Sequence, residues 1–449
     1  MRRLDLDAER FGTSKWNPLR MIAAPGHTVV IKPNAVWDVN LKVGQSIFAS
    51  ITHGSVLRAI LDYVYKAIDG SGRIIIADCP IMHSDFGHWR KVCGIDEIVD
   101  FYRDKLGFDV EVYDCRRLIA PWDFDSHYAP AELRRLSNGD PSGHKEIDLA
   151  SNSAFASLPD GLCRLLYGSD YHRENIVANH TGGRHRYCVA GTFLKADAII
   201  SVPKMKVHSK VGVTVSMKGF VGTQGDKNYL PHLRIGPPSR GGDEYPDTGI
   251  LQDWVNRYRM WLLCNVLSRE KSYLDWLYRT ILQPAYLLCD KVADRLKEHE
   301  EGVPYVGNIL GGSWFGNDTA WRMSLDLTRL ALYADADGHV ADVPCRSMLI
   351  FVDGILAGQA QGPLAPDEKK CGIVLCGRNP LSVDIAAARI MGFDPMKIPL
   401  LREGLKQLWL RSGNETEQTF VCSEGSEREL SALVGLFKPP RGWIGHIEA

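Results

Sequence analysis

The 449-residue chain lacks the features that mark several classes of protein. Its 53 Lys and Arg residues nearly balance its 54 Asp and Glu residues, so no global charge attracts nucleic acid or an anionic membrane. The 11 cysteines show no paired spacing, which favours a reducing, cytoplasmic compartment over a disulfide-bonded one. The most apolar stretch, 273–289, is interrupted by charged residues and a proline, so we expect no transmembrane segment.

The common cofactor motifs are also absent from the sequence. There is no Walker A loop, no G-x-G-x-x-G loop after the first predicted strand and no G-x-S-x-G elbow, which argues against ordinary ATP, NAD and acyl-hydrolase functions. No C-x2-C-x2-C run is present either, so we expect no iron–sulfur cluster. The composition, 45% hydrophobic and 24% charged, is typical of a globular protein.

Hydrophobic patterning predicts an α/β fold. Two buried strands at 28–32 and 73–78 flank an amphipathic helix that starts at Ser55 as its N-cap and ends before Gly70, an order typical of a βαβ unit and a parallel sheet. Residues 115–185 show weak periodicity and are expected to be irregular. Further elements are expected as strands at 108–113, 198–202, 347–352 and 372–375 and as helices at 94–106, 187–195, 318–333 and 382–391.

Three regions follow from this pattern. We expect a parallel-sheet N-terminal domain over 1–250, a helical insertion over 251–335 and a C-terminal α/β lobe over 336–449, with a crevice between the two α/β parts. The aromatic-rich helices of 254–300 are expected to pack on the core or to form a homo-oligomer contact. A membrane-surface patch is the alternative for these helices.

Polar residues follow several of the predicted strands. Lys32 and Asn34 follow the first strand, Asp78 the second, Lys204 the strand at 198–202, and Asp353 the strand at 347–352. The carboxyl ends of parallel strands converge on one crevice, where α/β proteins bind ligands. Each residue alone is equally well explained as a turn or helix-capping residue, but together they indicate a site.

Residues 204–218 alternate between apolar and polar side chains. If this segment is extended, one face is apolar and the other carries cations and hydroxyls, which suits a carboxylate or phosphate. If 212–220 is helical instead, its first amides would serve the same anion. The alternative without function is a half-exposed strand with a solvated lysine face. The polar positions are Lys204, Lys206, His208, Lys210, Gly212, Thr214, Ser216 and Lys218.

The next segment, 222–236, is a polar loop by composition. His232 is a candidate acid or base and Arg234 a candidate anion clamp, although a plain surface loop explains the composition equally well. His208, His232 and Asp226 are a weak candidate metal set, because no short ligand spacing supports it.

Four segments together resemble the family known as domain of unknown function 362. They are VVIKPN, ADAIISVPKMKVHSKVGVTVSMKGFVG, FVDGILAGQAQGPL and NPLSVDIAAARIMGFDP, and the resemblance spans most of 28–400. Many members of that family carry ferredoxin-like cysteines, which this chain lacks.

The spacing His208-x3-Gly212-x5-Lys218 is also similar to a segment of the nickel-pincer lactate racemases. That resemblance implies an acid/base role for His208 and a cofactor-tethering role for Lys218. The other catalytic and nickel-binding histidines of those racemases have no clear counterpart.

We therefore expect an enzyme that acts by acid/base chemistry on a small anionic substrate such as a hydroxy acid, a sugar acid or a phosphorylated sugar. The alternatives are a nickel-pincer-type racemase or epimerase and a non-catalytic binding module for an anionic metabolite. The cofactor is unknown, with a divalent metal as one option. The candidate residues are His208, Lys218 and His232 for catalysis, Lys32, Asn34, Lys204, Lys206, Thr214 and Arg234 for substrate, and Asp78, Asp226 and Asp353 for orienting bases or binding metal.

Overall fold

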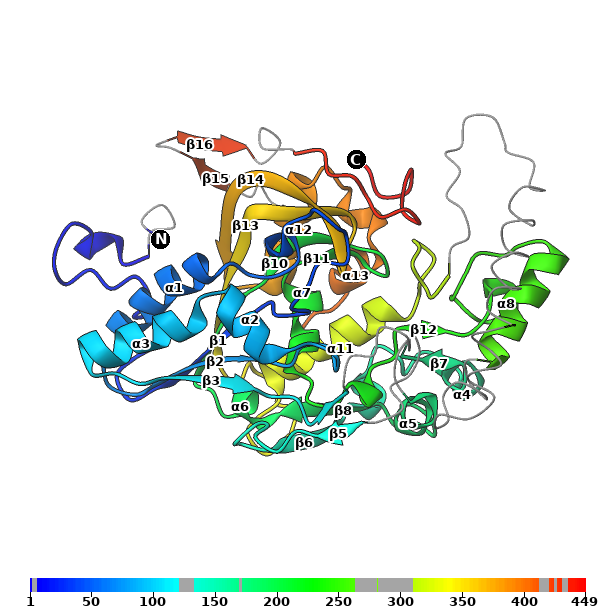
Figure 1. The fold of residues 1–449 in the computed structure, drawn as a ribbon, viewed down its shortest axis with the longest axis horizontal. Helices are drawn as coiled ribbons and strands as arrows, with labels where there is room; N and C mark the ends of the chain where they lie inside the picture. The colour runs from blue at the N-terminus through cyan, green and yellow to red at the C-terminus, as the bar shows by residue number, and fades with distance from the viewer. Residues whose placement is uncertain are drawn as a thin grey trace.

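A mainly parallel sheet runs through the centre of the molecule in the computed structural model (Figure 1). The strand order is β11-β10-β13-β9-β1-β2-β3, with β14 paired to β13. Pairing is parallel except between β10 and β11 and between β13 and β14. The predicted α/β fold class is confirmed. The structure describes residues 1, 6–120, 133–168, 172–262, 281, 310–411, 420–423, 426–429 and 435–449.

The sequence predicts six of the strands of the central sheet, with β13 and β14 much longer than expected, and it leaves the segment of β10 and β11 open between strand and helix. Their bounds are β1 Thr28–Pro33, β2 Arg73–Asp78, β3 Val110–Asp114, β9 Ala198–Val202, β10 Lys204–His208, β11 Gly212–Thr214, β13 Ser347–Gln361 and β14 Ala365–Gly377.

Two layers of helices cover the sheet because successive residues of each strand face opposite sides. Val29 and Ile31 of β1 belong to one core cluster with buried residues of α1, α2 and α3, whereas Val30 belongs to a second cluster with residues of α6, α11 and α12. The helices are α1 Gly54–Ala67, α2 Phe86–Val92, α3 Ile95–Leu106, α4 Asp160–Cys163, α5 Arg173–Asn179, α6 Gly191–Leu194, α7 Ser216–Gly219, α8 Ile250–Leu262, α11 Ala320–Tyr333, α12 Pro380–Ile390 and α13 Pro399–Gly404.

Short 3₁₀ turns and two-stranded ladders fill the remaining connections. The turns are η2 Ala8–Arg10, η3 Ile47–Ala49, η4 Ala150–Asn152, η5 Phe220–Thr223, η6 Lys227–Tyr229, η7 Pro238–Arg240 and η10 Pro395–Lys397. The paired strands are β4 Leu118–Ile119 with β5 Arg134–Arg135, β6 His144–Asp148 with β8 Arg186–Ala190, β7 Leu166–Tyr167 with β12 Leu233–Arg234, and β15 Phe420–Ser423 with β16 Ser426–Glu429.

Local expectations fail where pairing with a distant strand decides the structure. The helix predicted over 187–195 is instead strand β8 followed by the single turn α6, because β8 pairs along its whole length with β6. The region 115–185, expected to be irregular, contributes β6 and β7 to such ladders. The N-cap of α1 is His53 rather than Ser55, because the His53 side chain accepts a hydrogen bond from the Ser55 amide.

The C-terminal part of the chain supplies the middle of the sheet. β13 pairs in parallel with β9 on one side and β10 on the other, so it lies between two N-terminal strands. The boundary expected at residue 336 therefore does not separate two sheets. Helix α11, expected within an insertion, is buried almost throughout and packs against α7.

The structure describes only a small part of the stretch 254–300. Most of that stretch, including the expected oligomer contact, lies outside the described residues. In the part that the structure does describe, no helix has the length and apolar character needed to cross a membrane.

Candidate active site

A pocket of about 340 Å³ opens at the carboxyl ends of β1, β2 and β10. We call it the lysine pocket, because the described residues that line it include five lysines, two histidines and one carboxylate, Asp78. The sheet brings these residues together from distant parts of the sequence, as the strand-end argument predicts. The charged and ring-bearing lining residues are Lys32, Lys206, Lys210, Lys218, Lys227, His208, His232 and Asp78.

One wall of the pocket is the hairpin β10–β11 and the turn of helix α7 that follows it. Pairing joins Lys206 to Thr214 and His208 to Gly212 across the hairpin. The alternation in the sequence is retained, because Met205, Val207 and Val213 enter the hydrophobic core while Lys206, His208 and Thr214 line the pocket. The segment is thus a hairpin followed by a helical turn, which resolves the two alternatives left open by the sequence.

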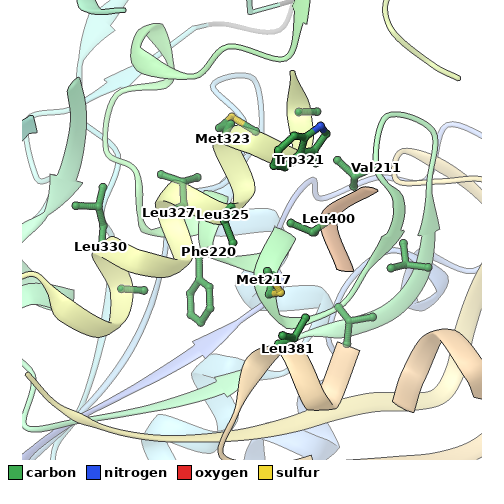
Figure 2. Packing of buried hydrophobic residues seen from close by; sticks show 14 of the residues in the cluster. Val211, Met217, Phe220, Trp321, Met323, Leu325, Leu327, Leu330, Leu381 and Leu400 are labelled. Atoms are coloured by element: carbon green, nitrogen blue, oxygen red, sulfur yellow. The ribbon is translucent and has the colours of Figure 1, made fainter. Parts of the chain in front are cut away.

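Helix α7 holds Lys218 in place through its apolar side. Met217 and Phe220 pack into the hydrophobic core among side chains of α11, with Leu381 of α12 and Leu400 of α13 close by (Figure 2). The expectation that the amides at the start of this helix bind the ligand is wrong. The carboxylate of Asp384 accepts the Ser216 and Met217 amides at 2.7 and 3.0 Å.

The opposite wall comes from β1 and β2. The Lys32 Nζ donates to Asp78 Oδ1 at 3.2 Å, and the other Asp78 oxygen accepts the Ala35 amide at 2.8 Å. The backbone of Gly222 lies so close to this ion pair that a Cβ at this position would overlap Asp78 Oδ1 and Lys32 Nζ. Only a glycine allows that close approach.

Most of the lysines of the pocket have oxygen partners. Lys206 Nζ donates to the Ser50 carbonyl at 2.5 Å, and Lys227 Nζ donates to the Cys79 and Val221 carbonyls at 2.7 and 2.8 Å. Lys210 donates to the Gly311 carbonyl. The carbonyls of Ser50, Cys79, Val221 and Gly311 carry no formal charge, so they do not neutralise the lysines that donate to them.

Lys218 differs from the other four lysines. It makes no hydrogen bond or ion pair with the residues that the structure describes, although its side chain is only 7% exposed. Burial lowers its pKa to about 7, and the neighbouring Lys227 and Lys210 add to the effect. An uncharged amine is the form that can act as a base or a nucleophile.

Burial also lowers the pKa values of the other titratable groups around the pocket. It lowers the pKa of Lys227 to about 8 and that of Lys206 well below 10.5. It holds the pKa values of His208 and His232 well below 6.5, with nearby lysines reinforcing the shift. Both imidazoles are therefore neutral at pH 7.

Hydrogen bonds assign opposite tautomers to the two neutral histidines. His208 Nδ1 accepts the Lys210 amide at 3.0 Å, so its proton is on Nε2. His232 Nδ1 lies 3.0 Å from the Leu230 carbonyl and must donate to it, which leaves Nε2 as the acceptor. One ring thus offers a proton donor and the other a base, as proton transfer requires.

The Thr214 hydroxyl is the remaining polar group of note. Its Oγ1 is buried and has no hydrogen-bond partner among the described residues, although Thr214 lines the pocket. A buried hydroxyl without a partner is costly, so it is a natural contact for a ligand oxygen. Asn34 also lines the pocket, and its Oδ1 accepts the Val36 amide.

Several residues expected at the site lie elsewhere. Lys204 and Asp353 form a fully buried ion pair at 2.8 Å and do not line the pocket. Arg234 donates to the Gly241 carbonyl and pairs with Asp318 at 3.2 Å. The ion pairs with Asp353 and Asp318 offset the cost of burying the charges of Lys204 and Arg234.

The three candidate metal aspartates are not brought together. Asp226 pairs with Arg117 at 2.8 Å, Asp353 with Lys204, and Asp78 with Lys32. In the described ranges, no group of three or more His, Cys, Asp or Glu side chains is arranged to hold a metal ion. Asp78 is thus the one of the three that belongs to the pocket, as a partner of Lys32.

Sequence reasoning did not select two lysines that line the pocket. Lys210 shares the polar alternation of its neighbours and could have been chosen on that signal. Lys227 carries no such signal, because its burial depends on the carbonyls of Cys79 and Val221.

A search of the curated proteins finds no match to this chain. A family model described as "Domain of unknown function (DUF362)" matches residues 139–389, more than half of the chain. The matched range contains Lys206, His208, Lys218 and His232, whereas Lys32 precedes it. The chain therefore belongs to the DUF362 family.

Proposed function

We propose that this protein is an enzyme that binds a small anionic substrate in the lysine pocket and moves protons on it. The single observation that carries the proposal is the set of charged side chains in the pocket, where the described lining residues include five lysines and one carboxylate. Buried cations of this kind favour a carboxylate or phosphate, which would replace the water excluded from them. A volume of about 340 Å³ suits a small metabolite.

The residues divide into two roles in this proposal. Lys32, Lys206 and Lys227 supply the positive field that holds the anion. His208, through Nε2–H, is the proton donor, and His232, through Nε2, is the base. Both histidines are neutral at pH 7, so neither needs to change charge before the reaction starts.

Anion binding is tested by thermal shift with inorganic phosphate, lactate and glycerate as probes. We expect at least one of the probes to raise the Tm of the wild-type protein, and Lys206→Met to abolish that rise. Lys195→Met is the matched control, because Lys195 is exposed and outside the pocket. An equal rise in both variants would contradict the proposed site.

Proton transfer is tested by deuterium exchange of carbon-bound protons in D₂O, followed by NMR, over hydroxy acids, sugar acids and phosphorylated sugars. We expect His208→Gln and His232→Gln to keep the anion-induced rise in Tm and to lose at least about 100-fold in exchange rate. Binding without exchange in the wild-type protein would favour a non-catalytic binding module. Exchange unchanged in both variants would contradict the roles of the histidines.

Hydride transfer of the nickel-pincer type is a second candidate. One observation favours it, because His208 and Lys218, the two residues that carry the resemblance, line the same pocket. The described side chains offer no ready set of three metal ligands, so the metal would need ligands from its own organic cofactor. Nickel analysis and intact mass, with Lys218→Ala as the control for a covalent adduct, distinguish this candidate.

A further inference from the structure

We infer that Lys218 is a nucleophile that forms a Schiff base with an anionic carbonyl compound, a 2-oxo acid or a phosphorylated ketose. The inference rests on the proposed function, since it names a substrate class for the same pocket. It starts from a contrast among the five lysines. Four have oxygen acceptors for their ammonium groups, whereas Lys218 has no partner in the part of the chain that is described.

An amine without an acceptor is poorly suited to holding a charge. The side chain of Lys218 is nearly buried, and Lys210 and Lys227 disfavour its protonation. With a pKa of about 7, roughly half of the amine is uncharged at pH 7. Desolvation beside other cations is an established way to activate a lysine toward carbonyl carbon.

The surroundings of Lys218 define the carbonyl compound. Lys206 and Lys227 line the same pocket and would attract a carboxylate or phosphate. The unpartnered Thr214 hydroxyl offers a further contact to a ligand oxygen. A substrate that carries an anionic group close to its carbonyl would satisfy both features at once.

The covalent step balances without another reactant. The Lys218 nitrogen attacks the carbonyl carbon to form a C–N bond, and one amine proton moves to the carbonyl oxygen. The carbinolamine then loses that oxygen and the second amine proton as water, leaving a C=N bond. His208 and His232 lie around the same pocket and can relay these protons.

Borohydride trapping tests this assignment on the full chain, with pyruvate and dihydroxyacetone phosphate as separate probes. Reduction adds a hydride to carbon and a proton to nitrogen, so the protein gains the mass of the probe minus one oxygen atom. We expect peptide mapping to place this adduct on Lys218, to saturate with probe, and to form at least about tenfold faster than at the exposed Lys195. Saturable labelling by pyruvate would identify a carboxylate as the anionic group, and saturable labelling by dihydroxyacetone phosphate would identify a phosphate.

The outcomes separate this inference from the proposed function. Stabilisation by both probes without an adduct on Lys218 would overturn the nucleophile and leave the anion site standing. Neither stabilisation nor an adduct would overturn both. The Lys218→Arg variant has a cation at this position but no amine, so it should bind the probes and form no borohydride-trapped adduct. If this variant is still labelled at another residue at the wild-type rate, the assignment to Lys218 is wrong.

Discussion

At the scale of single residues, the chain buries two lysines in opposite ways. Lys204 is fully buried but lies 2.8 Å from Asp353, which compensates its charge. Lys218 is almost as buried and has no such partner among the described residues. A buried charge without compensation lowers the free energy of unfolding. Burial of Lys218 therefore does not stabilise the fold, which is typical of a residue with a catalytic or binding role.

The cost of Lys218 depends on pH. Its pKa falls from 10.5 in the unfolded chain to about 7 in the folded protein. Between these values the unfolded state binds more protons, so stability rises with pH across this window. Below about pH 7 both states are protonated and the full penalty is present.

Lys218→Met should therefore stabilise the protein by a few kcal/mol below about pH 7, and the gain should fade as the pH rises toward 10.5. Urea unfolding near pH 6 and near pH 9 measures the difference. Lys195→Met, at an exposed position, should change stability little at either pH. A gain that is equal at both pH values would show that the amine does not titrate as described.

At the scale of elements, the hairpin β10–β11 and helix α7 act as one support for the pocket. The Asp384 carboxylate of α12 accepts the first amides of α7 and ties it to the C-terminal part of the chain. Burial raises the pKa of Asp384 to about 7. The position of Lys218 thus depends on a residue outside the pocket.

Asp384→Ala should lower the free energy of unfolding by about 1–3 kcal/mol, because two buried amides lose their acceptor. The rate of borohydride trapping at Lys218 should fall as α7 shifts. Asp394→Ala is the matched control, because Asp394 caps the short turn η10 outside the pocket. Unchanged trapping in a destabilised Asp384 variant would mean that the cap does not position the lysine.

The elements also show how far sequence reasoning reaches. The polar alternation of 204–218 was enough to predict that Lys206, His208, Thr214 and Lys218 share a face. It could not tell that Lys204 would meet Asp353, because that pairing depends on β13 entering the sheet beside β10. The alternation of side chains along the sequence predicted which residues share a face. The pairing of β13 with β10 determines that Lys204, unlike Lys218, lies beside a carboxylate.

At the scale of the whole molecule, β13 joins the two ends of the chain. It pairs with β9 over Ser347–Ile350 and with β10 near Lys204 and Lys206. The N-terminal strands alone cannot form this sheet, because its middle strand would be missing. The helical layers on both faces bury strands from both parts of the chain.

We therefore expect the amides of β1, β9 and β13 to exchange with solvent at similar free energies of opening, since they lie side by side in one sheet. Native-state hydrogen exchange followed by mass spectrometry measures this. Exchange of β13 at a much lower free energy than β1 would contradict a shared unit and would support a separable C-terminal lobe.

The place of β13 also sets when the pocket can exist during synthesis. The ribosome releases Lys32 early and Lys218 midway, but β10 gains its second neighbour, β13, only after residue 361 has left the exit tunnel. Until then the pocket lysines remain hydrated and fully charged. The uncharged amine of Lys218 is therefore a property that the chain acquires late, after β13 and the helix that carries Asp384 have joined the fold.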